Sequence, residues 1–368
     1  MVTRMVINRQ GELEWERGRR AKFARFRKDQ RYYLQQGVKV KESYRKSSRG
    51  VEIFTKEWLP APTTKGGSAP DVKALIFLCH GYGDTCNYFF DKLAIQFVKE
   101  GYGFFGLDYE GHGLSEGLHV YIPDFGKLVD DCVEYFVEIK GRPEFRKKQC
   151  FLFAESMGGA VALISHFKRP EEWNGAILLA PMCKIAADVS PHWVVSEILK
   201  KLAFAFPAWK AVPQRDLAEF AFRVPAKRAT GLENPLGYRG RPRLKTALEL
   251  LNITRYIADH MKEITLPFLV LHGEADRVTD PACSRELFNT AASKDKRIKT
   301  YPGSWHCLLS GEPDNVAQTV MSDILSWLDS RCSGDKKNIL ETIASTISSS
   351  SFTYPLVKKH GSRQSDDD

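Results

Sequence analysis

One serine stands in a setting that suits nucleophilic catalysis. Ser156 follows the short apolar run 150–154 and precedes a helical pattern that begins at Met157. A serine on a sharp turn from strand to helix needs small residues two places before and after it, because larger side chains would clash with both elements. Ala154 and Gly158 occupy those places, with Ala154 where Gly is usual. We therefore predict that Ser156 attacks an acyl carbon; the alternative is a serine that only caps the helix.

A second segment could stabilise the oxyanion that such an attack creates. His80-Gly81-Tyr82-Gly83 directly follows the apolar run 74–79. A turn at this place can point backbone N–H groups at the substrate oxygen, and such fixed donors are a large part of acyl-transfer catalysis. We expect the donors to be the backbone N–H groups of Tyr82 and Met157. The alternative for His80-Gly81 is a turn with a structural histidine.

The acid and base follow later in the chain. Asp276 and His306 each come after an apolar run, in the chain order serine, aspartate, histidine that this chemistry uses on a parallel sheet. The imidazole would take the serine proton, and the carboxylate would hold the imidazole tautomer. Asp280 is the second candidate for the acid, and His272 and His112 are weaker candidates for the base.

The elements needed to position these residues are visible as alternating patterns. Short apolar runs, separated mostly by helical patterns, lie at 74–79, 103–107, 150–154, 176–179, 268–271 and 298–301. Such alternation predicts a mostly parallel sheet with helices on both faces. Alternating residues around a Ser47–Gly50 turn predict an entry hairpin, and the stretch between Cys183 and Ile264 has helical patterns but no strand run. We interpret that stretch as an insertion above the sheet.

These motifs together resemble a known family. His80-Gly-Tyr-Gly-Asp, Gly111-His-Gly-Leu-Ser-Glu-Gly, Glu155-Ser-Met-Gly-Gly, His272-Gly-Glu-Ala-Asp-Arg-Val-Thr and Trp305-His306 are similar to motifs of the monoacylglycerol lipase group, closest to its plant branch with caffeoylshikimate esterase. The resemblance covers residues 38–331. It implies the α/β-hydrolase fold: an eight-stranded, mostly parallel sheet with a helical cap after the sixth strand. It also implies the triad Ser156, Asp276 and His306, with neither a metal nor an organic cofactor.

The predicted organisation has five parts. They are a basic N-terminal helical appendage (1–37, its helix over 12–35), the first part of the hydrolase core (38–183), a helical cap (184–264), the second part of the core (265–332) and a disordered tail (333–368). Inside the cap, Val195, Ile198, Leu199, Leu202 and Phe206 follow helical spacing, with Phe204 and Trp209 nearby. This stripe predicts packing of the cap on the body, an acyl-chain tunnel, or a membrane-docking face.

A second catalytic pattern is weaker. His119 and Asp124 match the H-x4-D spacing of some acyltransferases, but two residues at one spacing arise easily by chance. The Gly111-His-Gly-Leu-Ser segment is better interpreted as a turn that shapes the floor of the pocket.

Charge and cysteine content limit the environment. The first fifty residues hold fifteen Lys and Arg against five acids, a net charge of +10, whereas the rest of the chain carries −1. We expect this segment to contact an anionic membrane surface reversibly, with the cap as the other candidate, and we expect no nucleic-acid partner. Eight scattered cysteines without a C-x-x-C pair favour a reduced, cytoplasmic protein; peripheral membrane contact and a plastid location are alternatives. We also expect neither a secretory signal nor a membrane-spanning helix. The oligomeric state stays open.

The sequence thus predicts a serine ester hydrolase. The leading substrates are lipid monoesters, either monoacylglycerol or lysophospholipid. The alternatives are a polar phenolic ester such as caffeoylshikimate, or a low-turnover binding protein on the same scaffold.

Overall fold

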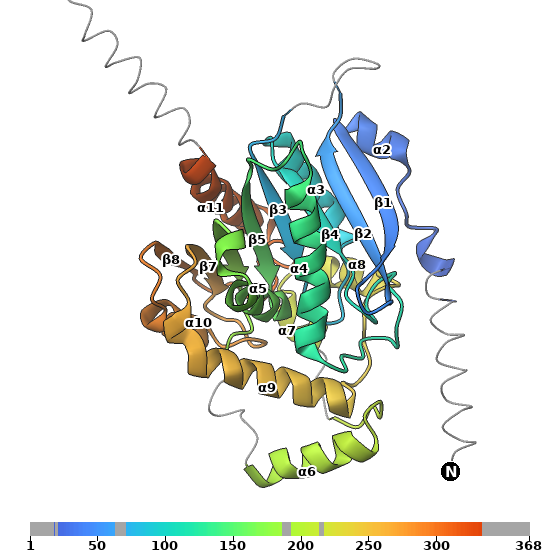
Figure 1. The fold of residues 1–368 in the computed structure, drawn as a ribbon, viewed down its shortest axis with the longest axis vertical. Helices are drawn as coiled ribbons and strands as arrows, with labels where there is room; N and C mark the ends of the chain where they lie inside the picture. Colours follow the sequence, from blue (N-terminus) through green and yellow to red (C-terminus); the bar gives the residue numbers. More distant parts are fainter. Residues whose placement is uncertain (1–17, 19–20, 63–70, 186–192, 213–216, 333–368) are drawn as a thin grey trace, which may run out of the picture. The chain divides into compact units, whose positions relative to one another are not determined.

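The centre of the fold is a single eight-stranded sheet (Figure 1). The structure is a computed structural model that describes residues 18, 21–62, 71–185, 193–212 and 217–332. The sheet order is β1-β2-β4-β3-β5-β6-β7-β8. The β1–β2 and β2–β4 pairs are antiparallel and all others are parallel, which confirms the predicted mostly parallel sheet. The strands are β1 (Val38–Lys46), β2 (Glu52–Pro60), β3 (Ala74–Cys79), β4 (Gly103–Leu107), β5 (Gln149–Glu155), β6 (Gly175–Leu179), β7 (Phe268–Gly273) and β8 (Lys296–Tyr301).

Helices and loops connect the strands. Those that follow or precede core strands are α2 (Gln30–Gln35), α3 (Phe89–Lys99), α4 (Phe125–Gly141), α5 (Met157–Lys168), α10 (Pro281–Thr290) and α11 (Asp314–Cys332). Between β6 and β7 lie α6 (Trp193–Ala205), α7 (Leu217–Ala221), α8 (Pro225–Glu233) and α9 (Leu244–His260). Two short 3-10 helices cover Pro170–Glu172 and Met261–Glu263. The chain divides into a unit of residues 1–325, which contains the whole sheet, and a unit of residues 326–368.

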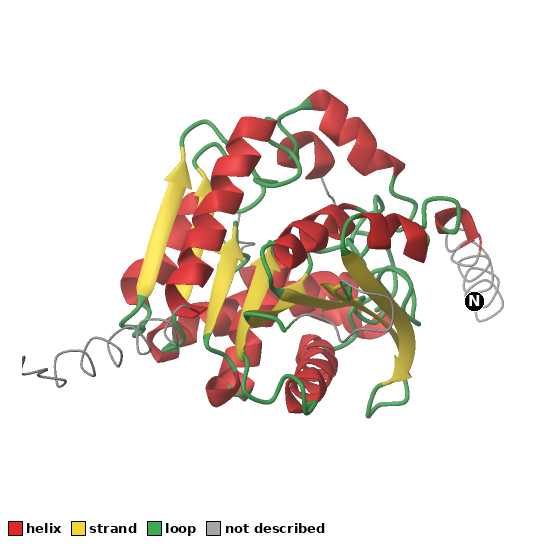
Figure 2. Ribbon diagram, turned by 90° about the horizontal axis from the view of Figure 1, so that it is seen from above, coloured by secondary structure: helices red, strands yellow, loops and turns green. Residues whose placement is uncertain are grey.

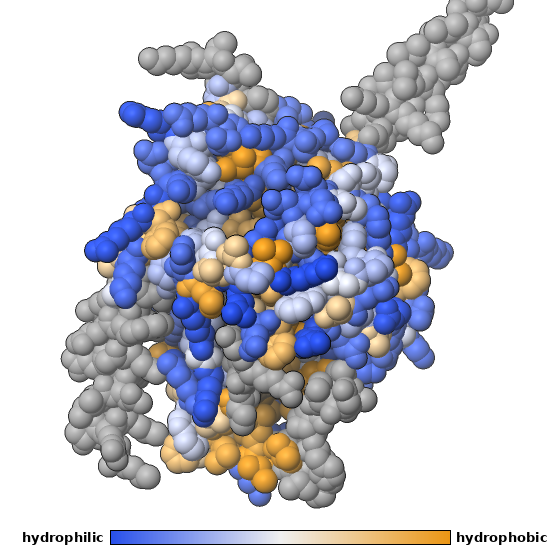
Figure 3. Space-filling view, turned by 180° about the vertical axis from the view of Figure 1, so that it is seen from behind, coloured by the Kyte–Doolittle hydropathy of each residue, from blue (hydrophilic) through white to orange (hydrophobic). Residues whose placement is uncertain are grey.

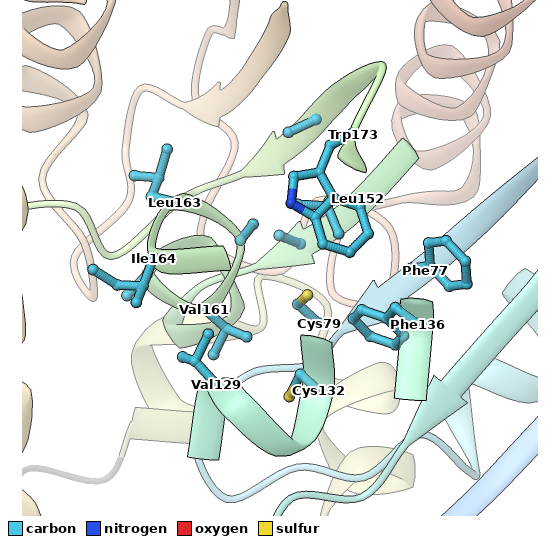
Figure 4. Packing of buried hydrophobic residues seen from close by; sticks show 14 of the residues in the cluster. Phe77, Cys79, Val129, Cys132, Phe136, Leu152, Val161, Leu163, Ile164 and Trp173 are labelled. Carbon is cyan, nitrogen blue, oxygen red and sulfur yellow. The ribbon is translucent and has the colours of Figure 1, made fainter. Parts of the chain in front are cut away.

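Both faces of the sheet are covered by helices, as Figure 2 shows. Side chains alternate along a strand, so neighbouring aromatic residues point to opposite faces. On one face the ring of Phe97, in α3, packs against Phe104 with a centroid distance of 5.2 Å and against Phe153 with one of 5.5 Å. On the other face Phe77 stacks on Phe136 of α4 at 4.7 Å (Figure 4). Cover on both faces explains why β3, β4, β6 and β7 are buried at every position.

A buried lysine joins the N-terminal helix to the sheet. The side chain of Lys56, in β2, is only 1% exposed, and its Nζ lies 2.7 Å from Asp91 and 2.9 Å from Glu42. It also donates to the hydroxyl of Tyr33, in α2, at 3.1 Å. Burial opposes the charge, but Asp91, Tyr33 and Glu42 together raise the pKa of Lys56, so the ammonium stays charged. This network anchors α2, and apolar periodicity gives no sign of it.

The N-terminal segment differs from the single predicted helix. Residues 27–29 are not helical, and Asp29 begins the short helix α2 by accepting a hydrogen bond from the backbone N–H of Tyr32 at 2.9 Å. The prediction of a continuous helix over 12–35 is therefore wrong for its described part, because an N-cap aspartate starts a new helix there. The rest of the predicted appendage, residues 1–17 and 19–20, and the predicted tail, 333–368, lie outside the described residues.

Candidate active site

Ser156 lies on a strained turn between β5 and α5. Its φ of 56° and ψ of −119° are unusual for a residue other than glycine. The surrounding backbone holds this conformation: the Ser156 N–H donates to Leu179 O at 3.0 Å, and Ser156 O accepts from the N–H of Met182 at 2.8 Å. Strain of this kind persists only where the structure over-determines it, and it concentrates at functional sites.

The glycines after the serine allow close packing of backbone. A Cβ on Gly158 would lie 1.9 Å from the carbonyl oxygen of Cys79, and one on Gly159 would lie 2.5 Å from Cβ of Pro181. Both positions therefore require glycine, which is the physical reason for the small residues of the motif. Ala154, at the other small position, is fully buried.

The loop after β3 lies beside the serine. A Cβ on Gly81 would be 3.6 Å from Cβ of Ser156, which brings the neighbouring Tyr82 into the same region. The side chain of His80 stabilises this loop. Its Nδ1 donates to Gly81 O at 2.9 Å, and its Nε2 accepts the Tyr109 N–H at 3.4 Å. Its ring also stacks on the ring of Tyr109. Complete burial lowers the pKa of His80 to about 3, so this histidine stays neutral. Met157 is the first residue of α5, where helix N–H groups are directed outward.

Asp276 and His306 are brought into direct contact. His306 Nδ1 lies 2.7 Å from Asp276 Oδ2, and both residues are buried. The other carboxylate oxygen, Oδ1, accepts the backbone N–H groups of Val278 at 2.7 Å and Thr279 at 3.2 Å. The Thr279 hydroxyl lies 3.0 Å from Asp276 Oδ2 and 3.2 Å from His306 Nδ1.

The electrostatics of this pair suit a base and its supporting acid. Burial disfavours a charged His306, but the charge of Asp276 and the hydrogen bond between them raise the pKa of His306 above its ordinary value. Burial alone would raise the pKa of Asp276; His306 and His272 hold it well below the usual range instead. Asp276 therefore stays ionised, and its charge can stabilise an imidazolium on His306.

A glycine lets the loop of Asp276 meet the loop of His306. A Cβ on Gly273, at the end of β7, would lie 2.3 Å from Trp305 O and 2.4 Å from Ser304 O. Thr279 links the same loops to β6, since its hydroxyl donates to Ala180 O at 3.0 Å. Since β5 to β8 run parallel, the loops that follow them meet at one edge of the sheet.

The alternative candidates have other structural roles. The Asp280 carboxylate accepts the backbone N–H of Ala282 at 2.7 Å and so caps α10, and Asp124 caps α4 by accepting the backbone N–H of Lys127 at 3.0 Å. His119 is buried with its ring edge-on to Tyr238, so the H-x4-D pair stabilises a loop and a helix end. His112 is buried within the aromatic group around His80.

Two further carboxyl groups belong to the electrostatic environment of the site. Burial is the main cause that raises the pKa of Glu155, the residue before Ser156, and His306 and Asp276 also act on it. Burial, followed by the charge of Glu155, raises the pKa of Asp84 to about 7. Sequence reasoning missed this pair, although both residues stand inside the motifs.

The helices between β6 and β7 are hydrogen-bonded to the loops of Tyr82 and His306. The N–H of Tyr238 donates to Gly83 O at 2.8 Å, beside Tyr82. The N–H of Cys307 donates to Ala221 O, and that of Val224 to Gly311 O, each at 3.0 Å. We call residues 217–260, which carry these bonds, the brace.

The brace is also hydrogen-bonded to the loop of residues 118–125. Thr246 Oγ1 accepts the N–H of Ile122 at 2.9 Å, and the Glu249 carboxylate accepts the N–H of Phe125 at 2.9 Å.

Helix α6 stands apart from these contacts and exposes apolar side chains. Val195 and Ile198 are more than half exposed, and Phe204 is 93% exposed. Its described inner contacts are with α9, through a cluster of Ala203, Leu244 and Leu248 with Leu199. Figure 3 shows apolar side chains gathered at the end of the molecule where Figure 1 places α6.

Within the described ranges, no group of three or more histidine, cysteine or acidic side chains could hold a metal ion. Over the same part of the chain, no helix is long and apolar enough to cross a membrane.

Comparison with known proteins identifies the family. A family model described as "serine aminopeptidase, S33" matches residues 70–314, which includes Ser156, Asp276 and His306. The chain belongs to this family. It is 34% identical over 307 residues to caffeoylshikimate esterase of Arabidopsis thaliana, a match that covers 82% of this chain and 89% of that protein. It is 29% identical over 286 residues to monoglyceride lipase of Rattus norvegicus, covering 77% and 88%.

A solved structure shows the same fold. A soluble variant of monoglyceride lipase from Saccharomyces cerevisiae, in complex with a substrate analog, has a TM-score of 0.68 at 21% identity. The similarity covers 78% of this chain and 94% of that chain. It confirms the α/β-hydrolase fold, and the family and its relatives make the chain a carboxylic ester hydrolase.

Proposed function

We propose that Ser156, His306 and Asp276 form the catalytic triad of this hydrolase. The observation that carries the proposal is the 2.7 Å contact of His306 Nδ1 with Asp276 Oδ2, in loops at the same edge of the parallel sheet as the strained turn of Ser156. His306 Nε2 accepts the serine proton as Oγ attacks the ester carbonyl, and it then protonates the leaving alcohol. Water activated by the same nitrogen releases the acid from the acyl-enzyme.

The oxyanion of each tetrahedral intermediate is held by the backbone N–H groups of Tyr82 and Met157. The contact of Gly81 with Ser156 and the position of Met157 at the start of α5 support this role. Removing one donor of an oxyanion hole costs about 2.7–4 kcal/mol of transition-state stabilisation. A replacement that shifts the Gly81 backbone should therefore reduce kcat strongly.

We propose lipid monoesters as the substrate class, namely monoacylglycerol or lysophospholipid. The exposed apolar side chains of α6 and the similarity to monoglyceride lipases support this choice. A polar phenolic ester is the second candidate, because the caffeoylshikimate esterase match has the higher identity and coverage. A low-turnover binding protein is the third, and substantial turnover of any ester in the panel below would exclude it.

A hydrolysis panel tests these assignments. Wild type and Ser156→Ala are compared on monoolein, lysophosphatidylcholine and caffeoylshikimate, with labelling by a fluorophosphonate as a check on the nucleophile. We expect fastest turnover of a lipid monoester and a loss of about 10⁴-fold or more in Ser156→Ala. Preferential turnover of caffeoylshikimate would contradict the substrate class, and an active Ser156→Ala would contradict the mechanism.

We propose that α6 docks the enzyme on an anionic phospholipid surface. The exposed Val195, Ile198 and Phe204 share this helix with Lys200 and Lys201, which are also exposed. Apolar side chains enter the interface while lysines pair with lipid charge. The N-terminal segment is the weaker candidate, because its aromatic residues Phe23 and Tyr33 are buried and its Phe26, at 41%, is much less exposed than Phe204.

Cosedimentation with anionic vesicles at low salt tests the docking surface. Phe204→Ser should reduce binding, whereas Tyr44→Ser, which changes a 52% exposed aromatic residue in β1, should not. Equal binding of both variants and wild type would exclude α6 as the anchor. A peripheral enzyme of this kind fits a cytoplasmic location, which the free cysteines also favour.

A further inference from the structure

A second histidine contacts the same oxygen of Asp276 as His306 does. His272, in β7, is fully buried, and its Nε2 lies 3.1 Å from Asp276 Oδ2. His306 Nδ1 reaches this oxygen from the other loop at 2.7 Å. The mechanism described above uses only His306. The position of His272 beside the carboxylate therefore needs its own explanation.

Neighbouring groups select one tautomer of His272. Its Nε2 faces the Asp276 carboxylate and, at 3.1 Å, the carbonyl oxygen of Thr279, and both can only accept a hydrogen bond. Nε2 therefore carries the proton. Nδ1 lies 2.8 Å from the hydroxyl of Ser284, in α10, which can donate to it. Ser284 is itself fully buried, so this partner is fixed by packing.

The Asp276 carboxylate thus accepts hydrogen bonds from several donors. Oδ1 accepts two backbone N–H groups, while Oδ2 is contacted by two imidazoles and by the Thr279 hydroxyl. A donor on Oδ2 stabilises its negative charge and weakens its pull on any other donor there. The N–H of His272 therefore moderates the strength with which Oδ2 attracts His306.

We propose that His272, held as its Nε2–H tautomer by Ser284, is a positioning residue that sets how strongly Asp276 stabilises protonated His306. The proposal rests on the proposed triad. His272 makes no contact with substrate in this role. It affects the reaction only through the Asp276 carboxylate.

The sign of the effect follows from the charges around His306. The carboxylates that act on His306 are Asp276 and, from β5, Glu155. Without the His272 donor, Asp276 presents more negative charge to the imidazole, and the imidazolium becomes easier to form. His306 then stays protonated, and inactive as a base, up to a higher pH. Glu155 is untouched by the change, so its contribution stays constant.

Two variants of matched size separate hydrogen bonding from packing. In His272→Gln the side-chain amide can take the place of Nε2–H, whereas His272→Met fills similar space without a donor. We expect the acidic limb of the kcat/KM profile of His272→Met to move to higher pH by roughly half a unit to one unit. His272→Gln should keep the acidic limb close to wild type.

Equal profiles for the Gln and Met variants, whether both shifted or both unchanged, would overturn the proposal. Ser284→Ala serves as a second variant if a His272 variant is poorly folded in thermal melting. It removes the donor to Nδ1 and should move the limb in the same direction by a smaller amount.

Spectroscopy tests the proposal independently of turnover. In ¹⁵N-histidine-labelled wild type, long-range ¹H–¹⁵N spectra should show His272, assigned by the signal missing in His272→Gln, as the Nε2–H tautomer. A Nδ1–H tautomer would refute it. If Ser156→Ala kept full activity while the tautomer was as expected, the proposed triad would fail and the hydrogen-bonded arrangement would stand.

Discussion

Replacing Gly273 by alanine should separate the two loops that hold Asp276 and His306. The new Cβ would lie 2.3 Å from Trp305 O and 2.4 Å from Ser304 O, whereas ordinary contacts begin at 3.4 Å. Both neighbours are backbone atoms, so no side chain can rotate away. One loop must move by about 1 Å, and a displacement of that size can cost about 10²-fold in rate.

We therefore expect Gly273→Ala to lower kcat/KM on a soluble short-chain ester about 10²-fold. The free energy of unfolding should fall by about 1–3 kcal/mol, as for other overpacked sites. Urea denaturation followed by circular dichroism measures the second quantity on the same preparation. Because the substrate is short and soluble, any effect of α6 on lipid binding does not enter the measurement.

Gly303→Ala is the matched control. Gly303 lies in the same loop as Ser304, with φ of +68° and open space around the position of a Cβ. Alanine there should cost about 1 kcal/mol of stability through backbone strain and leave kcat/KM nearly unchanged. A Gly273→Ala enzyme with the activity and stability of wild type would refute the argument that close approach of the two loops maintains the Asp276–His306 contact.

Four further outcomes are expected. Asp276→Asn should lower kcat about 10⁴-fold by favouring the wrong tautomer of the base, whereas Asp280→Asn, which keeps an N-cap, should leave kcat unchanged in the same assay. Ala154→Val should cost about 1–3 kcal/mol in denaturation and most of the activity, whereas Ala154→Gly should be tolerated. The kcat/KM of wild type should fall as pH drops through an apparent pKa above 6.5, because only neutral His306 can accept a proton and its pKa is raised; a midpoint below 6.5 would contradict this. Lys56→Met should lower the free energy of unfolding by about 3–5 kcal/mol, since it leaves the buried Asp91 carboxylate without its cation.

The core of the fold could be predicted because its signals are local. The apolar runs at 74–79 and 103–107 match β3 and β4 residue for residue, since each run is fully buried and bounded by turn residues. The candidates Ser156, Asp276 and His306 each follow such a run. The sequence predicts that these three residues lie together, because parallel strands place the loops that follow them at one edge of the sheet.

The remainder depends on contacts that the sequence does not display. Lys56 occupies a buried position of β2 only because Asp91, Glu42 and Tyr33 gather around it from other elements. By its place in the chain His272 is a weak candidate for the base, and its contact with Asp276 requires the fold of the loop. The predicted helix over 12–35 failed for a local reason, because an aspartate inside an apparent helical pattern can begin a new helix.

The brace has a consequence for how such an enzyme can change its substrate. Residues 217–260 hold the loops of Tyr82 and His306 by backbone hydrogen bonds, so exchanging them with a relative's segment would disturb catalysis together with specificity. Helix α6 carries none of these bonds among the described residues and contacts the rest through a small apolar cluster on α9. The surface that we propose for membrane docking can therefore drift, or be redesigned, by grafting α6 alone, while the reaction chemistry is inherited intact.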